Sequence, residues 1–339
     1  IGNSTHRLIL ELDLSDCGIN GILSLKHDKY FYSLEKLVCK NNNITELLDL
    51  PLNLQYLDCS NNQIIKLDKL PDKYQDKMVH FDCSNNRITE IKRFHKTLKY
   101  INCSNNQFVK LDNLNEEYFE LDISNNPIQD LKLYNDKNFN KIISDLATTL
   151  KNLYLGRDFN TELDNLPEGL ESLCFYEKSK FNKPINNLPK SLKKLVLNGV
   201  FNQFINNLPE ELEELEINGN FDKPVNNLPK SLKNLIIKGN FNFPLNRLPE
   251  NIKRLVVLSK YNFHVNDLPK NLNKLELGEY FNQPINLLPQ NLKSLIISNK
   301  YFSQSFNKLP NSLIHLEVYD NKFQKQKSHT NIIESIIHY

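Results

Sequence analysis

The chain has 339 residues, and 42 lysines and arginines face 40 aspartates and glutamates, so the formal net charge is only +2. This balance argues against a general nucleic-acid-binding surface, which needs a concentrated basic stripe. No apolar run of eighteen residues occurs, so no membrane span is expected. The six cysteines form no CxxC pair, which argues against a metal site, and reduced thiols favour a cytoplasmic protein.

A fixed spacing of apolar residues runs through the first part of the chain. In residues 34–44, Leu, Leu, Cys, Asn and Ile stand at positions 1, 4, 6, 9 and 11 of a unit, and this spacing occurs six times across residues 9–128. The pattern LxxLxLxxNxL resembles the leucine-rich repeat. Positions 4 and 6 then point inward from a short strand and position 5 points outward, and strands of successive units pair into one long parallel sheet.

Two residue types recur at fixed places in these units. Cysteine fills core position 6 in four of them, as a small buried apolar residue. Asparagine occupies position 9, where the chain turns off the sheet, so its amide is expected to satisfy unpaired backbone groups. The asparagines expected to form this structural ladder are Asn42, Asn62, Asn86, Asn106 and Asn126. Leu-Pro tails such as the one ending at Pro51 leave no room for a helix, so the convex side is expected to be extended or turn-like.

A second pattern begins after the interval from Tyr118 to Leu150, which stretches to 32 residues. Nine units start with Phe or Tyr from Phe139 onward, and FNKPINNLP at 181–189 is the clearest of them. This pattern resembles the FNIP repeat, which is known mainly from social amoebae and giant DNA viruses. The recurring Phe predicts a stacked aromatic spine under the convex side. Two files of Asn are expected to be structural, one directly after the Phe and one beginning at Asn186 and Asn206.

The predicted fold class is a leucine-rich-repeat solenoid with one short parallel strand per repeat of 20–25 residues. Residues 1–138 form the leucine-rich part with an N-terminal cap, and residues 139–320 form the FNIP part, continuous with the first in one solenoid. Residues 321–339 break the period. Thr330 or Asn331 could cap a short helix there that covers the end of the solenoid.

The sequence indicates neither catalysis nor a cofactor. No Ser-His-Asp, Cys-His or HExxH arrangement can be assembled from the eight histidines, so the chain is not expected to be an enzyme. Asp58, Asp82 and Asp122 all stand at the outward position 5. Three interpretations remain open for them: an acid/base pair, an acidic stripe facing a basic partner, or ordinary solvated surface.

The outward position 5 of the second part holds several apolar residues. Such a column indicates a partner surface, although β-branched residues also suit a sheet on which nothing binds. Cys174 lies in this column and is expected to be the thiol most reactive towards modifying reagents. The partner-binding residues predicted here are Tyr154, Val196, Glu216, Ile236, Val256, Glu276 and Ile296, with Asp58, Asp82 and Asp122 as a second, acidic patch.

We therefore expect a protein–protein interaction scaffold that binds a protein partner on the concave sheet face, without nucleic acid or membrane. Proteins with similar repeats often carry an F-box. The resemblance thus implies the substrate-recognition arm of an F-box-type ubiquitin ligase adaptor, acting in the cytoplasm of a host cell if the protein is viral. The alternative is a structural or virion-associated repeat protein with no soluble substrate.

Overall fold

The computed structural model describes residues 9–25, 31–67, 77–91, 94, 97–111, 120–133 and 149–318. Two compact units are distinguished: unit 1 comprises Ile1–Gly156 with Asn165–Gly169, and unit 2 comprises Arg157–Asp164 with Leu170–Tyr339. The described residues contain strands and turns but no α-helix, as the tight repeats and Leu-Pro tails predicted. The expected C-terminal helix lies outside the described residues.

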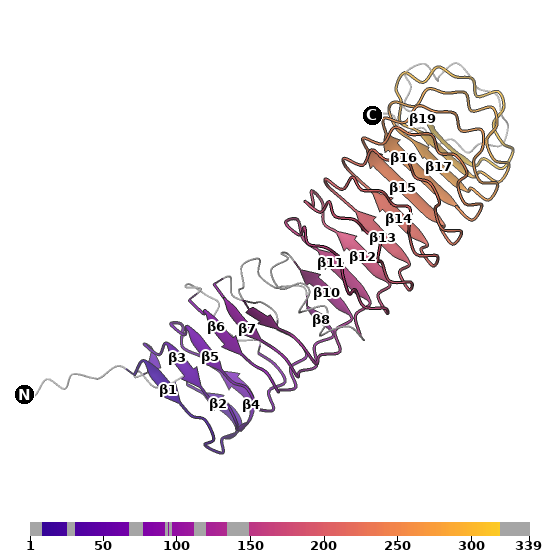
Figure 1. Ribbon diagram of the computed structural model, residues 1–339. Helices are drawn as coiled ribbons and strands as arrows, with labels where there is room; N and C mark the ends of the chain where they lie inside the picture. The colour runs from indigo at the N-terminus through magenta and orange to yellow at the C-terminus, as the bar shows by residue number, and fades with distance from the viewer. Residues whose placement is uncertain are drawn as a thin grey trace, which may run out of the picture. The chain divides into compact units, whose positions relative to one another are not determined.

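Unit 1 contains a six-stranded parallel sheet (Figure 1). Its strands are the segments of the leucine-rich repeats whose side chains were expected to alternate between inward and outward. Its strands, in order, are β1 (Glu11–Asp13), β3 (Lys36–Val38), β5 (Tyr56–Asp58), β6 (His80–Asp82), β7 (Tyr100–Asn102) and β9 (Glu120–Asp122). Leu37, Leu57, Phe81, Ile101 and Leu121 are in register at the buried central position. The spacing of the sequence pattern therefore fixed the register of this sheet.

A second line of strands follows the asparagine turns of unit 1. It consists of β2 (Asn20–Ser24) paired with β4 (Asn43–Leu48), single bridges at Lys66, and β8 (Lys110–Leu111) paired with β10 (Asp130–Leu133). The next strand, β11 (Asn152–Leu155), pairs with β10 and not with β9. The expectation of one long sheet is therefore wrong, because the sheet that begins at β1 ends at β9.

The sequence explains why β10 takes over. Its unit has Ile128, Leu131 and Leu133 at positions 1, 4 and 6 of the same spacing, and all three are buried. In this unit, therefore, the segment after the asparagine turn has the full apolar spacing that the strands of the first sheet have. Leu131 and Leu133 stand in register with Leu153 and Leu155, 22 residues further on. The long interval between Tyr118 and Leu150 therefore contains a strand that pairs like the repeats after it.

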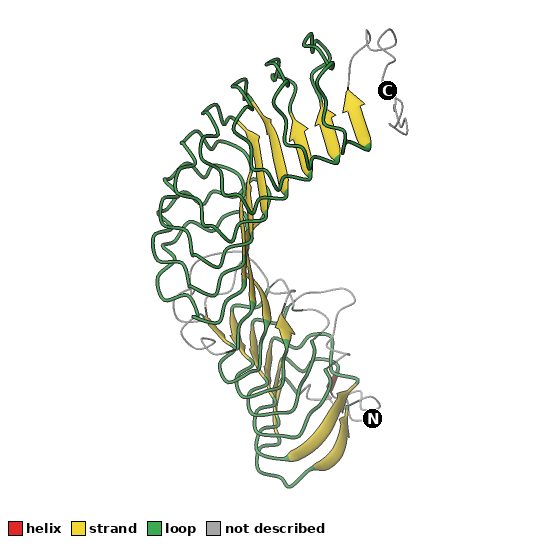
Figure 2. Ribbon diagram, turned by 90° about the vertical axis from the view of Figure 1, so that its right-hand side faces the viewer, coloured by secondary structure: helices red, strands yellow, loops and turns green. Residues whose placement is uncertain are grey.

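Unit 2 consists of parallel strands that pair in the order of the sequence (Figure 1). They are β12 (Ser172–Phe175), β13 (Lys194–Leu197), β14 (Glu214–Ile217), β15 (Asn234–Gly239), β16 (Arg254–Ser259), β17 (Lys274–Leu277), β18 (Ser294–Ile297) and β19 (His315–Val318). In Figure 2 the strands of unit 2 line one side of the coil and its loops form the other. The outward side chains of the strands therefore share one surface, which we call the sheet face of unit 2.

The predicted aromatic spine lies behind this sheet and is confirmed. Phe201 packs between Phe181 and Phe221, with ring centroids 6.0 and 6.2 Å away and interplanar angles of 5° and 10°. The same stacking continues through Phe241, Tyr261, Phe281 and Phe302. Six of these rings are at most 1% exposed and Phe302 is 4% exposed, so the spine forms a core of its own on the loop side.

The asparagine ladder of unit 1 is also confirmed. Asn62 donates its side-chain amide to the carbonyls of Cys39, Cys59 and Ser60, and its Oδ1 accepts from the backbone N–H of Ile44. All five asparagines of the ladder are buried and make this set of bonds, each linking its own turn to the preceding repeat. The cysteines at position 6, Cys39, Cys59, Cys83 and Cys103, are free thiols with no exposed surface.

The two asparagine files of unit 2 differ from each other. In the first, the Oδ1 of Asn182 accepts from the backbone N–H of Asn202, and the Oδ1 of Asn202 accepts from that of Asp222, so this file links neighbouring loops. The second file, which includes Asn186 and Asn206, is exposed, and no side-chain hydrogen bond is described for it. The structure therefore supports a structural role for the first file only.

Glycine is required where three successive loops of unit 2 stack most closely. Gly219 has a φ of +110°, and a Cβ on it would lie 2.1 Å from the carbonyl oxygen of Gly199. That carbonyl accepts a hydrogen bond from the N–H of Asn220, so it cannot move away without loss of the bond. Both the left-handed backbone and the contact exclude a side chain.

Candidate functional site

The predicted apolar column forms a continuous line on the sheet face of unit 2. Val196 pairs with Glu216, Glu216 with Ile236, and Ile236 with Val256 in parallel register. Val256, Glu276, Ile296 and Glu317 continue the same line. Neighbouring members are one strand spacing apart, about 4.8 Å. The structure therefore brings together every predicted member of the column that lies in unit 2.

The members of the column differ in how much surface they offer. Val196, Ile236 and Ile296 are partly exposed, whereas Val256 is only 2% exposed. A partner on this face would thus contact the isoleucines more than Val256. Tyr154 lies in unit 1, on β11, where it pairs with β10 residue Lys132, whose Nζ is 5.8 Å from the centre of the tyrosine ring.

Two carboxylates of the column are held by neighbouring side chains. Glu216 Oε1 accepts from Asn218 at 3.0 Å and from the Nζ of Lys238 at 3.2 Å. Burial by itself would raise the pKa of Glu216, but these two bonds together with the positive charges of Lys238 and Lys194 outweigh it, so the pKa is lowered. Glu276 lies 3.7 Å from the Nζ of Lys274. The column therefore presents apolar side chains next to two glutamates that are each paired with a neighbouring lysine, and it is not an acidic surface.

The predicted acidic patch lies on the sheet of unit 1. Asp58 stands in register with Asp82 on the next strand, Asp82 with Asn102, and Asn102 with Asp122. The sequence correctly placed these residues in one line. The amide of Asn102 donates to Asp82 Oδ2 at 3.1 Å, so one carboxylate oxygen is already bound within the patch.

These aspartates also have a local structural role that sequence reasoning missed. Asp58 Oδ1 accepts from both the backbone N–H and the hydroxyl of Ser60, at 3.0 and 2.7 Å. Asp82 and Asp122 accept in the same way from the N–H of the serine two residues later. Asp-x-Ser is therefore a turn motif that closes each strand. Since one oxygen of each carboxylate is committed to the turn, the geometry gives no support to an acid/base pair.

An aromatic stack lies next to the acidic patch, and the sequence analysis did not identify it. The rings of Tyr56 and His80 are 4.0 Å apart with an interplanar angle of 4°, and those of His80 and Tyr100 are 4.1 Å apart at 1°. All three side chains are outward, on β5, β6 and β7, and half-buried. The signal that could have found them is their shared position 3, two residues before each aspartate or asparagine of the patch.

The stack shifts the protonation equilibria of its members. Burial between the tyrosines lowers the pKa of His80 from its ordinary value of 6.5, although Asp82, Asp58 and Glu120 act in the opposite direction. Burial also raises the pKa of the Tyr56 and Tyr100 hydroxyls. His80 is therefore a neutral ring at pH 7, which suits face-to-face stacking between two tyrosines.

We expect the stability contributed by His80 to be lost in mild acid. Since the folded pKa is below the unfolded one, the unfolded chain takes up the proton first as the pH falls below about 6.5. The contribution is complete above that pH and declines as the pH falls towards the folded pKa. The measurement is the free energy of unfolding in urea at pH 7.5, 6.5 and 5.5 for wild type and His80→Gln. Their difference should shrink in acid, and a difference that does not change with pH would contradict the prediction.

The thiol of Cys174 is not activated as a nucleophile. Burial raises the pKa of Cys174, and a thiol with a raised pKa is a poor nucleophile at neutral pH. Cys17 is exposed whereas Cys174 is only partly so, so Cys174 is not the most accessible thiol and its predicted reactivity is not supported. Within the described residues, no cluster of three metal-ligating side chains occurs, and no helix has the length and apolarity to cross a membrane.

Comparisons with known proteins agree with this geometry. A family model described as FNIP Repeat matches residues 181–220, 261–300 and 281–320. None of the curated proteins compared with the sequence matches it. Among solved structures, the giant-virus protein CroV588, described as a circular leucine-rich-repeat protein, is 27% identical with a TM-score of 0.51. The likeness covers 93% of this chain but 45% of CroV588, so this chain spans less than half the length of that protein.

Two bacterial leucine-rich-repeat proteins are more distant. YopM of Yersinia pestis is 23% identical with a TM-score of 0.35, over 91% of this chain and 88% of its own. InlJ of Listeria monocytogenes is 21% identical with a TM-score of 0.40, over 91% of this chain and 67% of its own. The family match and the likeness to CroV588 carry the assignment. Residues 181–220 and 261–320 are FNIP repeats, and the chain that contains them is a leucine-rich-repeat solenoid.

Proposed function

We propose that the chain is a protein-recognition scaffold whose partner docks on the sheet face of unit 2. The observation that carries this proposal is the in-register column in which Val196, Ile236 and Ile296 alternate with carboxylates. A parallel sheet presents such a column as a flat, preorganised surface, and partly exposed apolar residues on it gain free energy when a partner covers them. Solenoids of this kind typically serve protein interaction.

The two surfaces of unit 1 extend the proposal. Asp58, Asp82 and Asp122 stand beside the Tyr56–His80–Tyr100 stack. Flat rings offer contact area at a low entropic cost. Asp58 is buried and Asp82 Oδ2 is bound by Asn102, so the carboxylate that can pair with a cationic side chain is that of Asp122, which is partly exposed and whose Oδ2 is not committed to the turn. Tyr154 adds a further ring on β11. In this proposal the two units offer separate docking surfaces: the acidic patch of unit 1 suits a basic segment, and the column of unit 2 suits an apolar one.

The experiment compares two substitutions on the column with one elsewhere. Full-length wild type and Ile236→Asp/Ile296→Asp are used to capture proteins from host lysate, followed by quantitative mass spectrometry. Leu287→Asp is the matched control, because Leu287 is an exposed apolar residue (63%) on the loop side. A partner of the column is one that Leu287→Asp retains and the double variant loses by about tenfold or more, since a buried unpaired charge costs several kcal/mol. Retention of every partner by both variants would overturn the proposal.

The same capture tests the finer assignment. If the chain is the substrate-recognition arm of an F-box-type ubiquitin ligase, ligase components should co-purify with it, and the double variant should keep them while losing the substrate. Co-purification with viral particles in place of a soluble partner would instead assign it a structural role. Thermal unfolding of all three proteins confirms that the substitutions leave the fold intact.

A further inference from the structure

A ladder of polar residues runs along the edge of unit 2, just before the strands begin. Its members, which we call the edge ladder, are Glu171, Lys193, Glu213, Lys233, Lys253, Asn273 and Lys293. Each N–H from Lys193 onward donates to the carbonyl of the preceding member at 2.8–2.9 Å. The backbone therefore holds the seven side chains in one evenly spaced line, about 4.8 Å apart.

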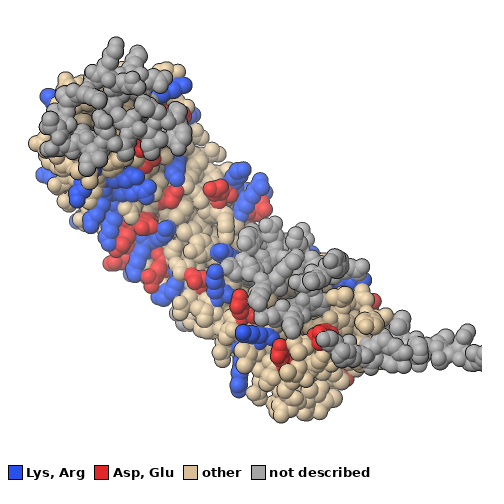
Figure 3. Space-filling model, turned by 180° about the vertical axis from the view of Figure 1, so that it is seen from behind, with Lys and Arg blue, Asp and Glu red and all other residues tan. Residues whose placement is uncertain are grey.

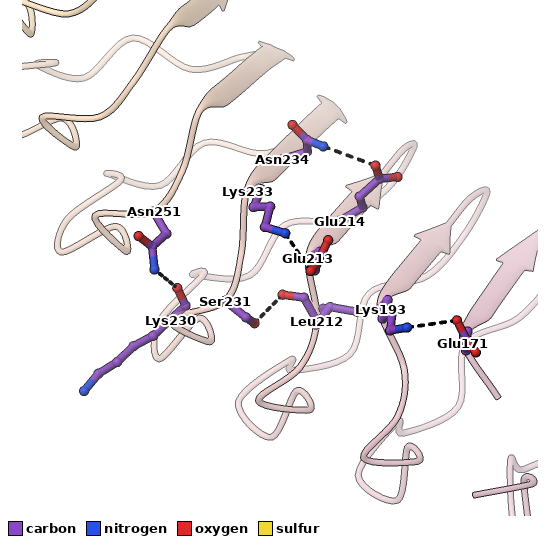
Figure 4. A network of polar contacts seen from close by, with 10 residues as sticks. All are labelled: Glu171, Lys193, Leu212, Glu213, Glu214, Lys230, Ser231, Lys233, Asn234 and Asn251. Atoms are coloured by element: carbon purple, nitrogen blue, oxygen red, sulfur yellow. Dashed lines mark hydrogen bonds and ion pairs between the residues drawn. The ribbon is translucent and has the colours of Figure 1, made fainter. Parts of the chain in front are cut away.

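The first four members neutralise one another. Lys193 Nζ lies 3.0 Å from Glu171 Oε2, and Lys233 Nζ lies 2.6 Å from Glu213 Oε1 (Figure 4). The bond to Glu171 also raises the pKa of Lys193. In this part of the ladder every lysine has a carboxylate on the preceding repeat, so its charge is already matched.

The last three members have no such match. The ladder continues as Lys253, Asn273 and Lys293, without a carboxylate, and no ion pair is described for either lysine in the part of unit 2 that the structure covers. Figure 3 shows a corresponding change: basic and acidic side chains alternate along the edge of unit 2, and basic ones gather toward its C-terminal end. The pairing that neutralises the ladder therefore stops after Lys233.

A pocket of about 350 Å³ opens at this place. It is lined by two lysines, Lys253 and Lys293, by four asparagines and by one serine, so its formal charge is +2 and no carboxylate lines it. The asparagine walls are held in place. Asn251, for example, donates to the carbonyl of Lys230 at 2.8 Å, as Figure 4 shows, and Asn271 and Asn291 make the equivalent bonds one and two repeats later.

We propose that this pocket binds a phosphate monoester. Lys253 and Lys293 are two ladder steps apart, roughly 10 Å between Cα atoms, and their flexible stems allow both ammonium groups to reach one oxyanion between them. Asn273 lies between the lysines and supplies amide donors. A phosphate monoester carries a charge of about −1.5 to −2 at pH 7, which matches the +2 of the pocket, and its three oxygens can accept all these bonds. This site does not depend on the apolar column being a docking surface.

The test follows the ³¹P signal of a short glycine-flanked phosphoserine peptide during titration with the full-length chain at fixed ionic strength. Wild type should shift the signal saturably. Lys253→Gln/Lys293→Gln should weaken binding by at least about tenfold, since two charge-assisted hydrogen bonds are lost. The matched control is Lys193→Gln/Lys233→Gln, which removes the same number of charges from the same ladder position. It should leave the affinity within about twofold, because those lysines are already paired.

Competition identifies the source of the oxyanion. Displacement by inorganic phosphate at equal concentration assigns the site to phosphate alone, and weaker displacement assigns it to peptide-borne phosphate. Both results support the proposal. Equal displacement by a glutamate peptide would overturn the assignment to phosphate. The absence of a saturable shift with wild type, or an equal loss in the two double variants, would overturn the site itself.

Discussion

Replacing Phe201 by alanine is expected to lower the free energy of unfolding by about 3–5 kcal/mol, the range found for large aromatic side chains removed from cores. The side chain is 1% exposed and packs between the rings of Phe181 and Phe221. Truncation removes its buried area and opens a cavity between two stacked rings, which the backbone hydrogen bonds on either side prevent from closing. Phe201→Leu should cost less, since it keeps most of the apolar volume but loses the ring contacts.

The same repeat supplies a control for this prediction. Phe204 is 56% exposed, and its one described ring contact is with Lys223, whose Nζ lies 5.5 Å from the ring centre. Phe204→Ala should therefore cost no more than about 1 kcal/mol. Urea unfolding followed by circular dichroism gives both values. If the two substitutions were equally costly, or Phe201→Ala were neutral, the stacked spine would not be a principal core of unit 2.

Much of the architecture could be predicted because the repeat period of the sequence determines which residues are buried and which of them are neighbours. A spacing of 1, 4, 6 and 9 specifies which side chains point inward, and the same spacing one repeat later specifies which of them meet. Leu195 and Leu215, or Phe201 and Phe221, must therefore lie side by side once the period is seen. The end of the first sheet at β9 and the pairing of β10 with β11 were not predicted. Ile128, Leu131 and Leu133 have the same spacing, but they follow an asparagine turn, where the sequence pattern of unit 1 predicts no strand.

The candidate surfaces were predicted only in part. The column and the acidic patch follow from register, but the role of Asp58 in its turn depends on Ser60, which lies outside the repeat consensus. Tyr56, His80 and Tyr100 were missed because a period-based search discounts positions whose residue type varies. The pocket at Lys253 could not be predicted from the repeat period either. It lies where the lysine–glutamate pairs of the edge ladder end, and these pairs are visible only in the side-chain contacts of Lys193 and Lys233.

Replacing Asn86 by alanine should destabilise unit 1 by about 3 kcal/mol or more. Its side-chain amide donates to the carbonyls of Cys59, Cys83 and Ser84, and its Oδ1 accepts from the N–H of Ile64 at 2.9 Å. Because the site is buried, no solvent replaces these bonds, and each buried polar group left without a partner costs about 1–3 kcal/mol. Asn86→Asp should be no better, since a carboxylate would face three carbonyl oxygens.

Asn206 provides the comparison, because it is exposed and no hydrogen bond of its side chain is described. Asn206→Ala should change the free energy of unfolding by no more than about 0.5 kcal/mol. Hydrogen exchange adds a local readout. The Ile64 amide should exchange slowly in wild type and much faster in Asn86→Ala, because Asn86 Oδ1 is its acceptor. Unchanged protection of Ile64 would mean that the turn finds another acceptor, and the ladder would then follow the register of the repeats rather than help to fix it.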